Sequence, residues 1–194
     1  MRRKRMADLV ARLGIGRGAR VLDLGGQPEI WNDVVLPLDI TILNLPGVAT
    51  RDVSSSHALV YVEGDACAVD GIGDGQFDLA FSNSVIEHVG DRHKRADFAK
   101  EVRRLGRAYW VQTPSKWFPI EAHTGMPFWW FLPESLRRYF IARWKGKLPA
   151  WTEMIESTTF VERAELQSLF PDGTLVIERL MGIPKSYIVF RRAE

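Results

Sequence analysis

Short apolar runs alternate with helix-like patterns along the first 112 residues of the chain. Each run is rich in β-branched or aliphatic residues, and most runs end at a turn that contains glycine, aspartate or proline. These features predict five strands, at residues 19–26, 39–45, 58–63, 76–82 and 108–112.

Helical spacing separates these strands. Leu9, Val10 and Leu13 predict a helix before the first strand, and residues 30–35 and 97–105 predict two more. Alternating helices with near-continuous apolar strands are typical of a parallel sheet that is covered on both faces. The ligand of such a sheet is expected beyond the carboxyl ends of its first strands.

The end of the chain has a different pattern. A helix is predicted at residues 162–169, followed by two apolar runs at 173–180 and 185–191. Only Met181-Gly-Ile-Pro184 separates the two runs, so they predict an antiparallel hairpin. The sheet is therefore expected to contain seven strands.

Composition favours one globular domain over residues 1–194, because 46% of the residues are hydrophobic and the sequence contains no repeat or flexible linker. The net charge of +2 does not indicate a nucleic-acid-binding protein. The only cysteine, Cys67, cannot form an internal disulfide, which favours a reducing compartment. The basic start has no apolar run behind it and predicts a helix rather than a leader. We expect a cytoplasmic protein.

Four of the predicted strands end in polar or glycine-containing segments. After the first strand comes Asp23-Leu-Gly25-Gly26, and the next alternate positions are Gln27 and Glu29 rather than glycine. Asn44 lies 21 residues after Asp23 (44 − 23), near the spacing at which an acidic residue contacts ribose in dinucleotide-binding folds.

The third predicted strand ends at Gly64-Asp65-Ala66, and the fourth runs into Ser82-Asn-Ser-Val-Ile-Glu-His-Val89. In this order, and together with the seven-strand pattern, these motifs resemble the class I S-adenosylmethionine-dependent methyltransferases, in particular the type 11 branch. The resemblance implies an α/β fold with a Rossmann-like, doubly wound, mostly parallel sheet and a C-terminal antiparallel hairpin.

The resemblance also implies a set of residues that bind S-adenosyl-L-methionine. Asp23 would accept from the ammonium group of its methionine part, and backbone N–H groups near Gly25 and Gly26 would meet the carboxylate. Asn44 would contact the ribose, Leu45 would pack on adenine, and Asp65 with the Ala66 N–H would read its edge. The expected cofactor-binding residues are Asp23, Gly25, Gly26, Asn44, Leu45, Asp65, Ala66, Ser82 and Asn83.

Two other functions stay open at this point. Because glycine is replaced at positions 27 and 29 and an acid at position 44, the chain is alternatively a noncatalytic, methyltransferase-like binding module. A NAD-dependent dehydrogenase is less favoured, since the turn lacks G-x-G-x-x-G. Each turn taken singly is equally compatible with a structural cap.

The expected acceptor is a small molecule, a glycan or a lipid-linked compound that is methylated on oxygen. Glu121 and His123 lie among apolar residues in the loop after the fifth strand, where the family builds its acceptor site. We expect His123 to act as a base or to orient the acceptor, with His88 as the second candidate. A partly buried structural histidine is the alternative.

Related quinone and small-RNA methyltransferases carry Glu-x-x-Glu-His as metal ligands at the position of His88. Here Ser84 replaces the first glutamate, so no metal site is expected. The alternative is a hard-metal site formed by Glu87, His88 and His123.

Aromatic residues are concentrated in the segment from the fifth strand to Trp151. Six of seven tryptophans, Trp110, Trp117, Trp129, Trp130, Trp144 and Trp151, lie there. We expect residues 113–160 to be an acceptor-side lid with a small core of its own. Cationic side chains alongside it suggest peripheral membrane contact, namely Arg137, Arg138, Arg143, Lys145 and Lys147. At least one ring of the run Phe128-Trp-Trp-Phe131 should be exposed.

Overall fold

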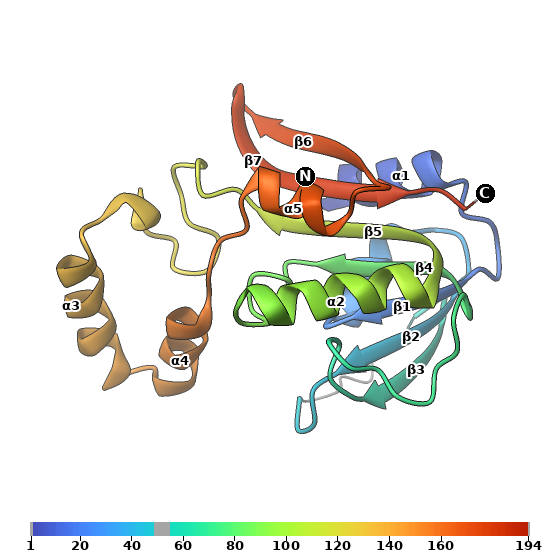
Figure 1. Cartoon of the computed structure of the whole chain (residues 1–194), viewed down its shortest axis with the longest axis horizontal. Coiled ribbons are helices and arrows are strands. Elements are labelled where there is room, and N and C mark those ends of the chain that lie inside the picture. Colours follow the sequence, from blue (N-terminus) through green and yellow to red (C-terminus); the bar gives the residue numbers. More distant parts are fainter. Residues whose placement is uncertain (1, 49–54, 194) are drawn as a thin grey trace.

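The computed structural model describes residues 2–48 and 55–193. Its centre is a seven-stranded sheet in the order β3-β2-β1-β4-β5-β7-β6 (Figure 1). The strands are β1 (Arg20–Leu24), β2 (Asp39–Asn44), β3 (Ala58–Glu63), β4 (Phe77–Asn83), β5 (Gly106–Pro114), β6 (Thr174–Leu180) and β7 (Ile183–Arg191). Strands β1–β5 are parallel, whereas β7 is antiparallel to both β5 and β6, which confirms the predicted hairpin.

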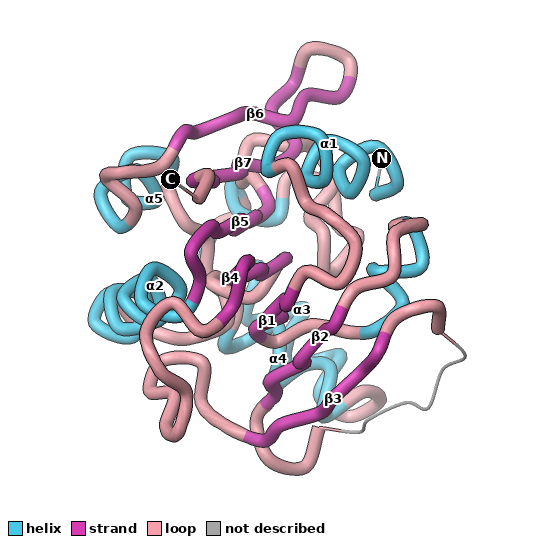
Figure 2. Tube along the Cα trace, turned by 90° about the vertical axis from the view of Figure 1, so that its right-hand side faces the viewer, coloured by secondary structure: helices cyan, strands magenta, loops and turns pink. Residues whose placement is uncertain are grey.

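Helices cover both faces of the sheet (Figure 2). On one face, α1 (Arg2–Leu13) and the 3₁₀ helix η1 (Pro28–Asp33) bury Met6, Leu9 and Trp31 against the strands. On the other, α2 (Arg92–Leu105) and α5 (Arg163–Leu169) bury Phe98 and Leu166. Two separate apolar cores result, which explains why the central strands are apolar on both sides.

Two predicted helices differ from those in the structure. The segment predicted as a helix at 30–35 is η1, which begins earlier because Pro28 suits a first helical turn. Helix α2 begins at Arg92, where the Asp91 carboxylate accepts from the N–H groups of His93 and Lys94. Glu87 and His88 therefore lie in the loop before α2 and not at the start of the helix.

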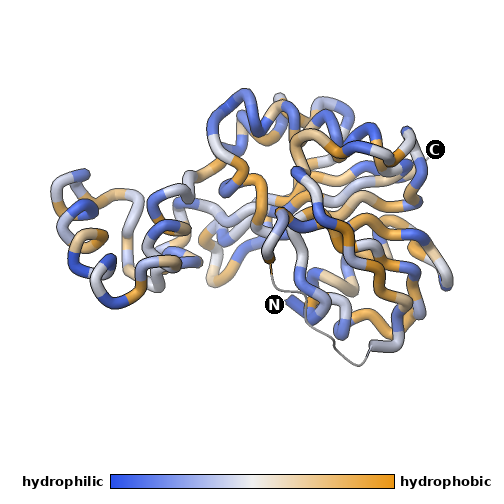
Figure 3. The backbone as a smooth tube through the Cα atoms, turned by 90° about the horizontal axis from the view of Figure 1, so that it is seen from below, coloured by the Kyte–Doolittle hydropathy of each residue, from blue (hydrophilic) through white to orange (hydrophobic). Residues whose placement is uncertain are grey.

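A helical segment lies beyond the carboxyl edge of the parallel strands. It contains η2 (Trp129–Phe131), α3 (Glu134–Lys145) and α4 (Pro149–Ser157), and it projects to the left in Figure 1. Figure 3 shows a mixture of polar and apolar residues along it, whereas the strands are mainly apolar. None of the helices in the described part of the chain is long and apolar enough to cross a lipid bilayer.

Candidate functional site

The carboxyl ends of β1, β2 and β3 surround a pocket of about 260 Å³, called here the strand-end pocket. Five of the predicted residues line it, namely Gly25, Asn44, Leu45, Asp65 and Ala66. The rest of its lining consists of Leu43, Val48, Gly64, Cys67, Val85, His88, Val89 and Lys94. The expected edge of the sheet thus carries a pocket at the expected turns.

The turn after β1 depends on two glycines for different reasons. Gly25 has a φ of +77°, a conformation that side-chain-bearing residues rarely adopt. Its N–H donates to the Leu43 carbonyl over 2.8 Å, so the Gly25 amide itself is not among the N–H groups of this turn that could meet a ligand carboxylate. A Cβ at Gly26 would lie 1.9 Å from Oδ2 of Asp23, so the carboxylate occupies that space.

The positions without glycine follow a path that does not require it. Gln27 is extended, with φ −126°, and Glu29 lies in η1. Any residue tolerates such backbone angles. The replacement of glycine at positions 27 and 29 therefore reflects a turn that leads into a 3₁₀ helix.

Asp23 lies below this turn and is completely buried. Its Oδ2 accepts from the Trp31 indole over 2.8 Å, whereas Oδ1 has no hydrogen-bond partner among the described residues. Burial raises the pKa of Asp23 to about 7, and the indole only partly offsets this shift. Asp23 supports Gly26 from beneath and does not line the strand-end pocket.

The raised pKa predicts a pH-dependent stability. The folded chain binds the Asp23 proton more tightly than the unfolded chain, so the contribution of this group is full below about pH 4 and is lost as pH rises through about 7. Relative to Asp23→Asn, the ligand-free wild type should lose roughly 4 kcal/mol of unfolding free energy across this interval. Urea unfolding from pH 4 to 8 measures it, and parallel profiles of the two proteins would contradict the assignment.

Asn44 and Asp65 present polar groups to the pocket. The Asn44 side-chain amide donates to the Gly26 carbonyl over 3.1 Å, which joins the first two strand ends. Asp65 accepts from the Cys67 N–H over 2.8 Å and pairs with Lys94 over 3.2 Å. The Cys67 N–H and then Lys94 lower the pKa of Asp65, despite partial desolvation, and keep it an anionic acceptor.

The last two predicted cofactor residues lie elsewhere. Ser82 is buried and donates to the Leu24 carbonyl over 3.2 Å, joining β4 to β1. The side-chain oxygen of Asn83 accepts from Arg5 of α1 over 2.6 Å. Neither residue lines the strand-end pocket. Val85 and Lys94 do line it, although neither was predicted to bind the cofactor.

A second pocket, of about 390 Å³, lies between the ends of β4, β5 and β7 and the loop after β5. We call it the loop pocket. Its apolar lining includes Phe118, Ile120 and Trp130. Its polar and charged lining consists of Arg5, Ser84, Gln112, Ser115, Glu121, Lys185 and Ser186. Because Ser84 lines this pocket and Val85 lines the strand-end pocket, one turn of backbone separates the two.

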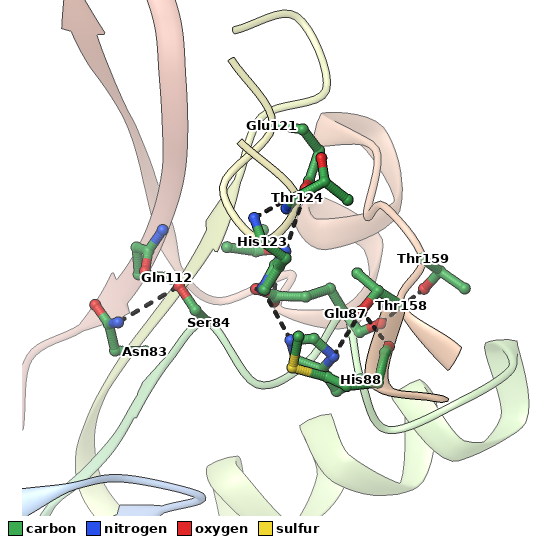
Figure 4. Close-up of polar contacts among 12 residues, drawn as sticks. Asn83, Ser84, Glu87, His88, Gln112, Glu121, His123, Thr124, Thr158 and Thr159 are labelled. Carbon is green, nitrogen blue, oxygen red and sulfur yellow. Dashed lines mark hydrogen bonds and ion pairs between the residues drawn. The ribbon is translucent and has the colours of Figure 1, made fainter. Parts of the chain in front are cut away.

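Polar side chains form a continuous chain between the two pockets (Figure 4). Glu121 accepts from Nδ1 of His123 over 2.8 Å, and Nε2 of His123 lies 3.0 Å from Nε2 of His88. Nδ1 of His88 in turn lies 3.1 Å from the Thr158 hydroxyl. All three predicted catalytic residues are thus in contact, although Thr158 was not anticipated.

Glu87 completes this cluster. It is buried, its Oε2 accepts from the Thr113 hydroxyl over 2.9 Å, and its Oε1 has no hydrogen-bond partner among the described residues. That oxygen lies 4.0 Å from Nε2 of His123. Burial raises the pKa of Glu87 to about 7, against the opposing Thr113 hydrogen bond and the His123 charge.

The two imidazoles have opposite protonation tendencies. Burial, and then the neighbouring His123 charge, lower the pKa of His88 to about 4. Burial acts in the same direction on His123, but its hydrogen bond to Glu121 and the nearby carboxylates raise its pKa overall. Burial raises the pKa of Glu121, but the hydrogen bonds from His123 and from the Thr124 N–H lower it overall.

The aromatic segment has a partly exposed surface. Phe128 and Phe131 are 58% and 51% exposed, while Trp129 is buried, so not all four rings of the run turn inward, as expected. Trp144 contacts Trp129 and Trp151 at centroid distances of 5.6 and 5.2 Å. Trp110 lies in β5, outside this segment, and belongs to the sheet core.

Comparison with known proteins places this geometry in a family. The methyltransferase domain family matches residues 12–108, half of the chain. No curated protein matches the sequence. Among solved structures, a methyltransferase from Methanosarcina mazei described as S-adenosylmethionine-dependent has a TM-score of 0.55 at 15% identity, with 96% of this chain and 98% of that chain covered.

Two further solved structures share the fold at a similarly low sequence identity. Phosphoethanolamine N-methyltransferase 2 from Haemonchus contortus, in complex with S-adenosyl-L-methionine, has a TM-score of 0.56 at 15% identity, over 90% of this chain and 38% of that one. A putative O-methyltransferase from Nostoc punctiforme has a TM-score of 0.54 at 14% identity, over 97% and 55%. The chain belongs to the methyltransferase domain family and is a class I enzyme that uses S-adenosyl-L-methionine.

Proposed function

We propose that the enzyme transfers the methyl group of S-adenosyl-L-methionine to a hydroxyl oxygen of an acceptor held in the loop pocket. The cofactor would occupy the strand-end pocket, with Asn44 near the ribose and Asp65 near adenine. Asp23 would act from below by supporting the turn, together with Gly25 and Gly26.

The observation that carries this proposal is the polar chain between the two pockets. His88 lines the strand-end pocket, Glu121 lines the loop pocket, and the His123 side chain contacts both of these residues. A hydroxyl is a poor nucleophile while it keeps its proton, so an O-methyltransferase needs such a group beside the acceptor. We expect His123, held by Glu121, to take up or orient that proton, with His88 as its partner.

The reaction is an in-line displacement at the sulfonium methyl group. A lone pair of the acceptor oxygen forms the new O–C bond, and the electrons of the breaking C–S bond return to sulfur, which leaves as the neutral thioether S-adenosylhomocysteine. The acceptor proton passes to the polar chain. Most of the rate gain comes from holding acceptor and donor in line.

The lining of the loop pocket favours an acceptor with an apolar body and polar substituents. Phe118, Ile120 and Trp130 offer apolar surface, whereas Ser84 and Gln112 offer hydrogen-bonding groups. A small phenol or alcohol, a glycan or a lipid-linked compound has this character. The exposed Phe128 and Phe131 beside the pocket support the lipid-linked class and peripheral membrane contact.

A paired acceptor panel tests the proposal. Each candidate alcohol or phenol is offered with its methyl ether and its amine analogue, and transfer of a tritiated methyl group from the cofactor is measured. Label should enter the free hydroxyl compound and not its ether. Label that enters only amines would contradict O-methylation.

Peripheral membrane contact is tested with anionic vesicles that carry a lipid-linked phenol as the acceptor. The protein should sediment with them, and less so at high salt, because the cationic side chains of α3 would meet the lipid headgroups. Arg138 and Lys145 are already paired with Glu134 and Glu156, which limits the effect. Protein that stays in the supernatant would exclude membrane contact from the reaction.

A further inference from the structure

The outer nitrogen of His123 is fixed as a donor by its carboxylate partner. Oε2 of Glu121 accepts from the backbone N–H groups of His123 and Thr124, over 2.8 and 2.6 Å. Oε1 of the same carboxylate lies 2.8 Å from Nδ1 of His123. Since an ionised carboxylate only accepts hydrogen bonds, Nδ1 of His123 carries a hydrogen.

The outer nitrogen of His88 is fixed in the same sense by a hydroxyl. The Thr158 hydroxyl has one hydrogen, which it donates to the Met154 carbonyl over 2.7 Å. With its hydrogen on that carbonyl, the hydroxyl accepts from Nδ1 of His88, which lies 3.1 Å away. Nδ1 of His88 carries a hydrogen as well.

A neutral imidazole has only one N–H, so both Nε2 atoms present lone pairs. These lone pairs face each other over 3.0 Å. Two lone pairs at this distance repel unless a cation lies between or beside them. With the hydrogens placed in this way, either His123 carries a second proton or a metal ion binds both nitrogens.

A third donor favours the metal. Oε1 of Glu87 is buried without a hydrogen-bond partner among the described residues, and it lies 4.0 Å from Nε2 of His123. The three donor atoms all lie within 4.8 Å of one another. Ligands about 2.1 Å from one ion lie roughly 3–4 Å apart. The spacings of 3.0 and 4.0 Å therefore suit a common ion, and the remaining pair, which lies within 4.8 Å, needs at most a small side-chain shift.

The surroundings of the three ligands have the pattern of a metal site. Ligating histidines usually donate their other N–H to a carboxylate or another oxygen, as His123 and His88 do here. The Thr113 hydroxyl likewise holds the second oxygen of Glu87. We infer that Glu87, His88 and His123 bind a divalent transition-metal ion of the Zn²⁺ type.

The three ligands favour a different ion from the hard metal that the sequence suggested as an alternative. Two imidazoles and one carboxylate suit Zn²⁺, whereas Mg²⁺ prefers oxygen ligands. Such three-ligand sites keep a coordination position for substrate or water. Resting on the proposed function, the ion would lower the pKa of the acceptor hydroxyl and thereby ease removal of its proton. With Nε2 on the ion and Nδ1 donating to Glu121, His123 would then hold the ion and so orient the acceptor oxygen, and it would not itself be the base.

Metal binding is tested on the full chain without cofactor or acceptor. Chelator-treated protein is titrated with Co²⁺, followed by visible absorption, and with Zn²⁺ by calorimetry. One ion per chain should bind, and millimolar Mg²⁺ should not displace it. His88→Ala and His123→Ala should each weaken Zn²⁺ binding more than about 100-fold, because even loss of an outer partner costs 10–100-fold.

Three further variants change an outer partner, the carboxylate ligand and a residue outside the site. Thr158→Val, which removes only the partner of His88, should weaken binding roughly 10-fold. Glu87→Gln should also weaken it, whereas His93→Ala, on the exposed side of α2, should not. Circular dichroism checks that each variant folds.

Two outcomes would overturn the inference. The first is wild-type protein that binds neither Co²⁺ nor Zn²⁺, and the second is histidine variants that fold and bind the ions as wild type does. Either result would mean that a proton on His123, and not a metal ion, lies between the two imidazoles. Since no methyl transfer is measured, failure of the proposed O-methylation would leave these results unchanged.

Discussion

Replacement of His123 by alanine should lower turnover about 100- to 10,000-fold while leaving the affinity for S-adenosylhomocysteine nearly unchanged. A group that withdraws a proton or orients the reacting oxygen contributes on this scale. His123 does not line the strand-end pocket, so its loss should leave the bound cofactor in place. Turnover is measured with the acceptor found by the paired panel, and affinity by calorimetry.

The control for this result is His93→Ala. His93 is exposed on α2 and makes no contact with the polar chain that the structure describes, so its replacement should leave turnover within about twofold, as expected of surface changes. An unchanged rate in His123→Ala would remove His123 from the mechanism. A rate that falls only because cofactor affinity falls would place it in the cofactor site instead.

Replacement of Gly26 by alanine should destabilise the protein by roughly 3 kcal/mol or more and abolish product binding. The added Cβ would lie 1.9 Å from Oδ2 and 2.1 Å from Cγ of Asp23. Because Asp23 is completely buried, it has no space into which it can withdraw, so the turn itself must move. The strand-end pocket would then lose the wall formed by Gly25.

Gly16→Ala is the matched control for this prediction. No atom lies within 4 Å of a Cβ added at Gly16 in the described part of the chain, and its φ is not positive. The unfolding free energy of the Gly16→Ala variant should stay within about 0.5 kcal/mol of the wild-type value, and its binding of the product should be unchanged. Thermal unfolding and calorimetry measure both variants, and equal behaviour of the two would contradict the packing argument.

The sequence predicted the strands better than the helices. β-branched runs such as residues 39–45 indicated strands whose apolar side chains are buried on both faces. The start of α2 was missed because Asp91, its cap, lies six residues before Asp97, where the predicted helix begins. Helices α3 and α4 were not predicted from the sequence, because the many aromatic residues of that segment obscure helical spacing.

The strand-end pocket was largely predictable because each contributing turn directly follows a strand. Asn44 and Asp65 are brought together by parallel register alone, which pairs Asn44 with Glu63. The polar chain was less predictable. His88 contacts residues 35 and 70 positions away, and no local pattern indicates that Thr158 would fix its tautomer.

Titration calorimetry with S-adenosylhomocysteine tests the assignment of the strand-end pocket most directly. Wild-type protein should bind one equivalent, and Asp65→Ala should weaken binding about 10- to 100-fold, since a hydrogen bond to a charged group contributes roughly 1.5–3 kcal/mol. Asp70→Ala, at an exposed position nearby, should bind like wild type. Undiminished binding by the combined Asp23→Ala and Asp65→Ala variant, or a preference for NADH, would contradict the assignment.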